Sequence, residues 1–190
     1  MQICFATNNK GKLQEIKALL DGKVTIVSLQ EIGCNEELPE TRSTIEGNSL
    51  QKAEFVWENY GVSCFADDTG LEVEALNGEP GVYSARYAGP DCSPEDNMVL
   101  ILEKMKGQAN RKALFRTCIT LILDGVVHQF EGNVTGALLE KKQGEKGFGY
   151  DPIFKPEGQG KSFAEMTMEE KNSISHRAIA VKALVAFLKK

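Results

Sequence analysis

The chain has 190 residues, of which 42% are hydrophobic and 26% are charged, and its formal net charge is −5. This length is sufficient for one domain with a sizeable core, and the composition is typical of globular proteins. The negative net charge argues against a surface that coats nucleic acid, although it leaves room for a local basic pocket. No apolar stretch is long enough to cross a bilayer. We therefore expect neither a nucleic acid nor a membrane as a partner.

The cysteine pattern indicates a reducing environment. Among the five cysteines no two form a Cys-x-x-Cys motif, and Cys4, Cys64 and Cys118 lie in apolar runs, where cysteine is usually buried. A cytoplasmic location fits this pattern best. The chain has only two histidines, which excludes a multi-histidine zinc site. Its first residues lack the basic region of a signal peptide and are predicted to form a strand.

The N-terminal segment predicts a strand, a polar loop and a helix. Residues 2–6 are strand-like, and Thr7-Asn8-Asn9 are of the types that cap helices. Lys10 and Lys12 lie at the start of the helix, where unsatisfied amides and the helix dipole favour anions. The spacing is equally compatible with two solubilising lysines on a capped helix. The residues that recur at helical spacing are Leu13, Ile16, Leu19 and Leu20.

The next elements are a short strand and a longer helix. Residues 24–27 are strand-like, and residues 48–60 carry an apolar stripe at helical spacing, with Lys52 outside that stripe. A polar connection between them contains several glutamates, among them Glu40.

Two adjacent carboxylates follow the next strand. Residues 62–66 predict a buried strand that ends at Asp67-Asp68, where Thr69-Gly70 would turn the chain into an alternating strand over residues 71–76. Adjacent carboxylates repel each other unless a cation compensates them, and a divalent metal with oxygen ligands is one such cation. The alternative interpretation is a solvated turn, and this segment alone favours it.

The second half of the chain mixes helices and strands. Ser93-Pro94 and Thr167 have the character of helix starts, and an apolar stripe over residues 178–188 predicts a C-terminal helix. Asp124-Gly125 predicts a hairpin between two β-patterned runs. We therefore predict a mixed β-sheet flanked by helices, in a single α/β domain over residues 1–190. The predicted strands of this half are residues 112–123, 126–134 and 136–140.

Two further clusters suggest a ligand-binding site. Residues 147–151 place two aromatic rings and a carboxylate on a glycine-rich loop, which suits a planar ring. Residues 170–173 and 175–177 place several hydrogen-bond donors near a helix start. Taken alone, the loop is better explained as a turn that aromatic residues anchor to the core, and the donors as helix capping with surface charge.

Several short motifs occur in a fixed order along the chain. They are Ala6–Lys12, Glu46-Gly47-Asn48-Ser49, Ala66–Leu71, Gly81–Tyr87, Gly147–Asp151 and Ser175-His176-Arg177. This order resembles that of the inosine triphosphate pyrophosphatase family, in particular its bacterial branch, the non-canonical purine nucleoside triphosphate pyrophosphatases. The resemblance covers essentially the whole chain, and the ordered set is specific although each motif alone is weak. Thr69 stands where the family often has serine, which also supplies a hydroxyl.

The resemblance implies a two-lobed α/β protein with a long central mixed sheet, a cleft between the lobes and usually a homodimer. The implied reaction is hydrolysis of inosine, deoxyinosine and xanthosine triphosphates to the monophosphate and pyrophosphate, which removes deaminated purines from the nucleotide pool. The implied cofactor is Mg²⁺, and the implied ligands are small-molecule purine nucleoside triphosphates.

The resemblance also implies roles for individual residues. Asp68 would bind the metal and help to activate water, with Asp67 beside it and Glu40 as a further metal ligand. A triphosphate repels a nucleophile, so such a site depends on charge neutralisation and positioning. The residues implied to contact the substrate are Thr7, Asn8, Asn9, Lys10, Gly11, Lys12 and Lys52 at the phosphates, Thr69 elsewhere on the substrate, Phe148, Gly149, Tyr150 and Asp151 at the nucleoside, and Lys171, His176 and Arg177 at the base.

Two other functions stay open. An enzyme for modified pyrimidine nucleotides would use the same phosphate and metal motifs, and only the residues at the base argue against it. A non-enzymatic nucleotide- or RNA-binding module would need a basic surface rich in aromatic residues, which a net charge of −5 and an aromatic content of 7% do not favour.

Overall fold

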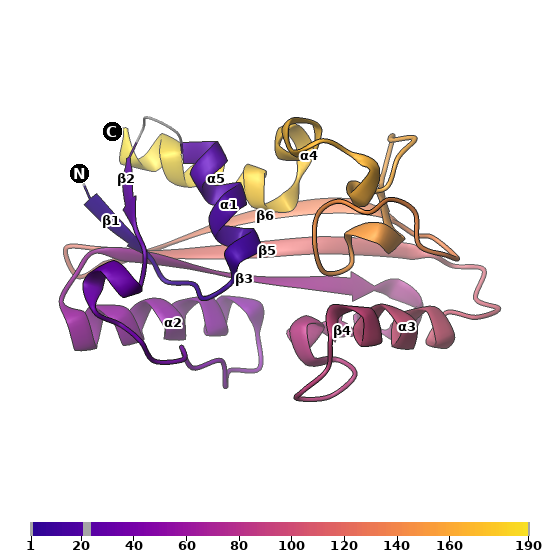
Figure 1. The fold of residues 1–190 in the computed structure, drawn as a ribbon, viewed down its shortest axis with the longest axis horizontal. Helices are drawn as coiled ribbons and strands as arrows, with labels where there is room; N and C mark the ends of the chain where they lie inside the picture. The colour runs from indigo at the N-terminus through magenta and orange to yellow at the C-terminus, as the bar shows by residue number, and fades with distance from the viewer. Residues whose placement is uncertain (1, 21–23, 190) are drawn as a thin grey trace. The chain divides into compact units, whose positions relative to one another are not determined.

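The computed structural model describes residues 2–20 and 24–189, shown in Figure 1. The α-helices of these residues are α1 (Lys10–Leu20), α2 (Ile45–Tyr60), α3 (Pro94–Lys104), α4 (Met168–Ile174) and α5 (His176–Leu188). The strands are β1 (Gln2–Phe5), β2 (Thr25–Val27), β3 (Cys64–Val73), β4 (Pro80–Gly81), β5 (Lys112–Leu123), β6 (Val126–Leu138) and β7 (Phe154–Pro156). Within the described ranges, every helix is too short or too polar to span a bilayer.

The described strands pair into one mixed sheet. Their order is β2-β1-β3-β5-β6-β7, and β4 pairs with β3. β1 is parallel to both β2 and β3, whereas β4 is antiparallel to β3 and β7 is antiparallel to β6. Parallel neighbours require long crossover connections, which contain α1 and α2 here. Asp124 and Gly125 both have positive φ, as the tight turn predicted between β5 and β6 requires.

The chain divides into two compact units. Unit 1 comprises Met1–Asp68, Thr117–Gly132 and Arg177–Lys190. Unit 2 comprises Thr69–Arg116 and Asn133–His176. Each of the strands β3, β5 and β6 therefore contributes one part to unit 1 and another part to unit 2.

Unit 1 has a hydrophobic layer on each face of its part of the sheet. Phe5 of β1 and Phe65 of β3 stack at 4.6 Å between ring centres and lie in one cluster with α1 and α5. Cys4 and Ala66 lie in a different cluster with α2. Successive side chains of a strand point to opposite faces, so this alternation assigns each strand residue to one layer. The next two residues of β3 inherit these two directions.

Unit 2 has one continuous core. Met98, Ile101 and Met105 of α3 are buried in it together with residues of β3, β5 and β7. Phe115 of β5 contacts Phe154 of β7 edge to face, with ring centres 4.6 Å apart. The core also contains residues of the connection between β6 and α4, which is thereby fixed to the sheet.

Most predicted elements are confirmed, and the differences lie among the strands. Capping boxes join Ser93 to Asp96 and Thr167 to Glu170, as the sequence predicts. The separate strand expected over residues 136–140 is wrong, because β6 continues to Leu138 and pairs there with β7. The strand β7 itself was not predicted. The single domain with a cleft between two lobes stays a prediction.

Candidate active site

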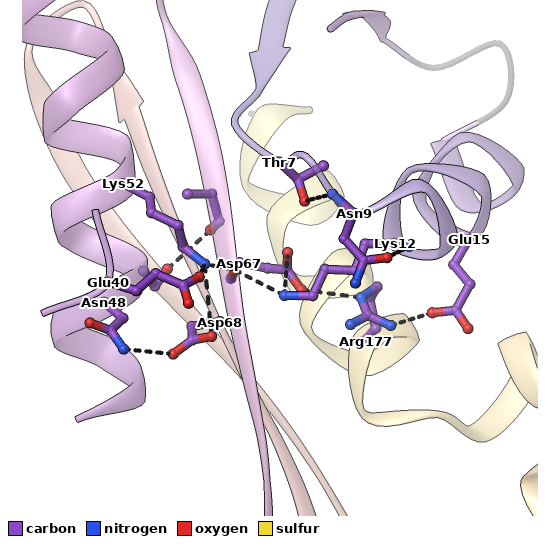
Figure 2. Close-up of polar contacts among 12 residues, drawn as sticks. Thr7, Asn9, Lys12, Glu15, Glu40, Asn48, Lys52, Asp67, Asp68 and Arg177 are labelled. Atoms are coloured by element: carbon purple, nitrogen blue, oxygen red, sulfur yellow. Dashed lines mark hydrogen bonds and ion pairs between the residues drawn. The ribbon is translucent and has the colours of Figure 1, made fainter. Parts of the chain in front are cut away.

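Asp67 and Asp68 lie within β3 and not in a turn. The turn predicted at Thr69-Gly70 is wrong, since β3 runs without interruption from Cys64 to Val73. Consecutive strand residues point to opposite faces, so the two carboxylates lie in different surroundings. Figure 2 shows Asp67 with side chains of α1 and α5, and Asp68 on the side of α2. Each carboxylate is therefore compensated by its own set of cations.

Asp67 is buried in a network of charged side chains. Its carboxylate lies 3.2 Å from Lys12 Nζ and accepts a hydrogen bond of 3.2 Å from Arg177 Nε. Arg177 also donates to the buried carboxylate of Glu15. Burial alone would raise the pKa of Asp67, but Lys12, Arg177 and Lys52 together hold this pKa well below its usual range. Asp67 is therefore an ionised anchor for three cations.

Asp68 has a different balance of charges. Its Oδ1 lies 3.7 Å from Lys52 Nζ, and its Oδ2 accepts a hydrogen bond of 3.3 Å from Asn48 Nδ2. The same ammonium lies closer to Glu40, at 2.5 Å from Oε1. Burial raises the pKa of Asp68, and the neighbouring Glu40 and Asp67 add to this effect, against the attraction of the lysines. A carboxylate with a raised pKa is suited to accept a proton from water.

Two lysines meet at one backbone oxygen. The backbone carbonyl of Asp67, in β3, accepts hydrogen bonds from Lys52 Nζ at 2.8 Å and from Lys12 Nζ at 3.3 Å. Lys52 is buried, so the prediction that it lies outside the core-facing stripe of α2 is wrong. Burial lowers the pKa of Lys12, and the nearby cations Lys52 and Arg177 act in the same direction. Two ammonium groups at one oxygen repel each other, and an anion bound beside them would reduce this repulsion.

The loop between β1 and α1 is organised around Asn9. The side-chain oxygen of Asn9 accepts from the N–H of Lys12 at 3.1 Å, which caps α1 as the sequence predicts. The N–H of Asn9 donates to Thr7 Oγ1, also at 3.1 Å. These two hydrogen bonds fix the start of α1, which carries Lys12, the residue that contacts Asp67. The contact of this loop with phosphate stays a prediction, and its remaining members, Asn8, Lys10 and Gly11, are exposed or half-buried.

In unit 2, Asp151 and Lys171 form a buried ion pair. Lys171 Nζ lies 2.6 Å from Asp151 Oδ2, which also accepts the N–H of Phe148 at 2.9 Å. The ammonium lies 4.9 Å from the centre of the Phe148 ring. Gly147 has a φ of 74°, and a Cβ at this position would come within 2.1 Å of Asp151 Oδ2, so only glycine fits. The loop and Lys171 of α4 together gather an aromatic ring, a carboxylate and an ammonium, which suit a polar planar ring.

Two other residues expected to contact the nucleoside or the base are buried in the core of unit 2. Tyr150 donates its hydroxyl to the carbonyl of Ser84 at 2.7 Å. This bond agrees with the alternative interpretation, in which an aromatic residue anchors the loop. His176 stacks on Phe115, with ring centres 4.6 Å apart and the ring planes 11° from parallel. Contact of either residue with substrate stays a prediction.

Arg177 was expected at the base, and its guanidinium lies in the charged network of unit 1. It forms ion pairs with the carboxylates of Glu15 and Asp67, and its side chain is 1% exposed. In this position Arg177 fixes Asp67, and a contact with the base stays a prediction. The structure places Thr69 half-buried in β3 and gives Gly149 a φ of 60°, without testing their contacts with substrate.

Known proteins resemble this chain over nearly its whole length. The model of the Ham1 family matches residues 3–187. The chain belongs to the Ham1 family. It is 53% identical to the dITP/XTP pyrophosphatase of Flavobacterium johnsoniae, over 99% of this chain and 98% of that protein. It is 55% identical to the dITP/XTP pyrophosphatase of Porphyromonas gingivalis, over 98% of this chain and 97% of that protein.

Solved structures of Ham1 proteins share the fold. The Staphylococcus aureus Ham1 protein superposes with a TM-score of 0.90 at 39% sequence identity. A HAM1 protein from Coxiella burnetii superposes with a TM-score of 0.91 at 33% identity. Each comparison covers 100% of this chain and 98% of the other chain. The predicted mixed sheet flanked by helices, and the predicted family, are therefore confirmed.

Two buried residues of this site were not predicted from the sequence. Glu15 pairs with Arg177, and Asn48 donates to Asp68. Glu15 lies one turn after Lys12 on the stripe of α1 that also carries Ile16 and turns toward the sheet, so helical spacing was a usable signal. The part of Asn48 was hidden, because only the fold brings α2 next to the middle of β3.

Asp68 and Glu40 fit a magnesium ion in the type and direction of their oxygens. Both carboxylates lie against the ammonium of Lys52, so their oxygens already converge on one cation. In residues 2–20 and 24–189, no three His, Cys, Asp or Glu side chains gather in a metal-binding arrangement. Mg²⁺ typically takes one or two carboxylates together with substrate phosphates and water. The protein would thus supply part of the ligand shell, and the substrate would supply more of it.

Proposed function

We propose that this Ham1 protein hydrolyses non-canonical purine nucleoside triphosphates, namely those of inosine, deoxyinosine and xanthosine, to the monophosphate and pyrophosphate. The observation that carries the proposal is the convergence of Lys12 and Lys52 on the carbonyl of Asp67, beside the carboxylate of Asp68. Relatives that share more than half of its residues are named dITP/XTP pyrophosphatases, which supports this choice of substrates.

In this proposal, unit 1 binds the triphosphate. Lys12 and Lys52 neutralise phosphate charge, and the start of α1, capped by Asn9, offers backbone amides to a phosphate oxygen. A triphosphate repels an incoming nucleophile, so much of the rate enhancement comes from this neutralisation. Arg177 and Glu15 act at a distance, because they hold Asp67 and through it Lys12.

Asp68 takes a proton from the attacking water in this scheme. Its raised pKa suits a general base, and its fixed hydrogen bond with Asn48 holds it in one orientation. Asp68 and Glu40 would hold Mg²⁺, which when bound supplies charge neutralisation and orientation at the phosphates. The α-phosphorus is the atom attacked, since the leaving group is pyrophosphate.

The loop that carries Phe148 is proposed to contact the base. The ring of Phe148 gives a surface for stacking, and the nearby Lys171 and Asp151 give a donor and an acceptor. Hypoxanthine and xanthine carry a 6-oxo group, which accepts a hydrogen bond, whereas adenine carries a 6-amino group, which donates one. A buried donor left without an acceptor costs about 1–3 kcal/mol, so adenosine triphosphate should be a poor substrate.

The experiment is a substrate panel assayed for pyrophosphate. Inosine, deoxyinosine, xanthosine, adenosine, guanosine and modified pyrimidine triphosphates are incubated with and without Mg²⁺. We expect pyrophosphate from the first three, only with the metal. Preference for a modified pyrimidine would support the other enzymatic interpretation instead. Binding of nucleotide without any product would contradict an enzyme of this class.

We further propose that the enzyme is a cytoplasmic homodimer. The resemblance to the family supports the dimer, and the five free cysteines suit a reducing compartment. Light scattering during gel filtration tests the dimer, and the mass of a single chain at micromolar concentration would contradict it.

A further inference from the structure

The segment that carries Glu40 has no regular secondary structure, and the first turns of α2 hold it in place. Gln51 makes two hydrogen bonds to Thr41: its Oε1 accepts the Thr41 N–H at 2.9 Å, and its Nε2 donates to Thr41 Oγ1 at 2.8 Å. Lys52 contacts Glu40 itself. The position of the Glu40 carboxylate therefore depends on α2, although Glu40 precedes that helix in the chain.

Asn48 joins this segment to Asp68. Its Oδ1 accepts the N–H of Arg42 at 2.9 Å, and its Nδ2 donates to Asp68 Oδ2 at 3.3 Å. The first bond fixes which end of the amide faces Asp68, because a donor must face the amide oxygen. The side chain of Asn48 is fully buried, so water cannot replace either bond readily. Gly47 leaves room for this arrangement, since a Cβ there would lie 2.9 Å from Arg42 Cβ.

We propose that Asn48 is a positioning residue that sets the geometry of the Asp68–Glu40 pair, with Gln51 as a second support for Glu40 alone. Asn48 fixes the carboxylate plane of Asp68, so that Oδ1 faces Lys52 and Glu40. It also fixes the backbone two residues after Glu40. This inference rests on the proposed function, in which these two carboxylates act on the triphosphate and its metal.

The test compares buried substitutions that do and do not touch this pair. In Asn48→Leu both hydrogen bonds are lost while the branching of the side chain at Cγ is kept. We expect kcat for inosine triphosphate to fall by about 10- to 100-fold, the range typical of residues that orient metal ligands. KM should change by less than about threefold, because the phosphate-binding lysines are untouched. Gln51→Ala should lower kcat less, by roughly three- to tenfold, since it loosens Glu40 only.

Thr120→Val is the matched control. Thr120 is fully buried and accepts hydrogen bonds from Ser49 and Gln129, but it does not belong to the Asp68–Glu40 pair. We expect this variant to lose some thermal stability and to keep its kcat. If Asn48→Leu does not fold, as judged by circular dichroism, Asn48→Ser is measured in its place, because serine is too short to make both bonds.

A second readout does not depend on turnover. Mn²⁺ is titrated by electron paramagnetic resonance in the presence of a non-hydrolysable inosine triphosphate analogue. We expect the dissociation constant of Mn²⁺ to rise at least about tenfold in the folded Asn48 variant, and to stay unchanged in Thr120→Val. An unchanged kcat and an unchanged Mn²⁺ affinity in the folded Asn48 variant would overturn the inference.

Asp68→Asn separates this inference from the proposed function. If Asp68→Asn is inactive while the folded Asn48 variant behaves like the wild type, the inference is wrong and the proposed function stands. If Asp68→Asn turns over like the wild type, the proposed role of Asp68 is wrong, and the inference falls with it.

Discussion

The two faces of β3 treat neighbouring carboxylates in opposite ways. On the face of α1 and α5, Asp67 is enclosed by Lys12 and Arg177, and its pKa is held well below the usual range. On the face of α2, Asp68 shares one ammonium with Glu40, and burial raises its pKa. The first arrangement stabilises an ionised group that stays fixed. The second disfavours the ionised form of Asp68, which a bound metal would stabilise.

The two aspartates have the same side chain, so their different roles follow from their positions in the strand. Asp67 contributes to stability and fixes Lys12, whereas burial raises the pKa of Asp68, as suits a group that accepts a proton. Active sites commonly concentrate such perturbed groups. Substitution of Asp68 should therefore mainly reduce activity, and substitution of Asp67 should mainly reduce stability.

The largest effect is expected for Asp68→Asn, which keeps the shape and removes the charge. We expect kcat to fall by at least about 100-fold, the low end for loss of a general base. Lys52 keeps Glu40 and the carbonyl of Asp67 as partners, so the unfolding free energy should stay equal or rise. Steady-state kinetics and thermal melts measure both, and a stable variant with near-normal turnover would make Asp68 merely structural.

Asp67→Asn should show the opposite pattern in stability. Breaking a buried ion pair from one side costs about 3–5 kcal/mol of unfolding free energy, and Arg177 and Lys12 are left with less negative charge. Because the folded-state pKa of Asp67 is lowered, its stabilising contribution is complete above the unfolded pKa of about 4 and is lost as pH falls through the folded value. The stability difference from wild type should therefore shrink below about pH 4. A difference that grows on acidification would contradict this assignment.

Lys12→Ala should have a smaller effect on catalysis, divided between binding and turnover. The loss of one charge-assisted hydrogen bond is worth about 1.5–3 kcal/mol, which corresponds to roughly 10- to 100-fold in kcat/KM. KM should rise and kcat should fall together, because the charge acts in both the ground state and the transition state. The matched control is Lys17→Ala, an exposed lysine in the last turn of α1, which should change neither constant. Equal kinetics in the two variants would make Lys12 an anchor of Asp67 only.

The smallest effect is expected in unit 2. Phe148→Leu removes the aromatic ring beside Lys171 and keeps a hydrophobic side chain. Loss of stacking should cost about 0.5–1.5 kcal/mol, which raises KM for inosine triphosphate by roughly two- to tenfold with kcat unchanged. Kinetics with inosine and adenosine triphosphates measure the change. A fall in kcat without a change in KM would indicate that Phe148 acts at the phosphates and not at the base.

Local signals in the sequence predicted what local interactions decide. The capping boxes at Ser93 and Thr167 and the Asp124-Gly125 turn need only neighbours in the chain, and all three are present. The turn at Thr69-Gly70 was predicted because the apolar run ends at two carboxylates and a glycine follows them. That prediction failed because their compensating cations come from distant segments, and Arg177 lies 110 positions from Asp67.

The same reason explains why Lys52 and Asn48 were misjudged or missed. A lysine is not expected on the buried face of a helix unless carboxylates of another segment are known to compensate its charge. The residues quoted in the motifs were nevertheless the right region of the chain to examine. The four residues of the buried pairs Asp67–Arg177 and Asp151–Lys171 were all predicted as site residues. Which of them pair with each other could be seen only in the fold.

The most direct test of the account is the site of attack on inosine triphosphate. Hydrolysis is carried out in water labelled with heavy oxygen, and the products are separated and analysed by mass spectrometry. Attack of water at the α-phosphorus predicts that the label appears in inosine monophosphate and that pyrophosphate is unlabelled. Label in orthophosphate, released together with inosine diphosphate, would contradict the proposed reaction.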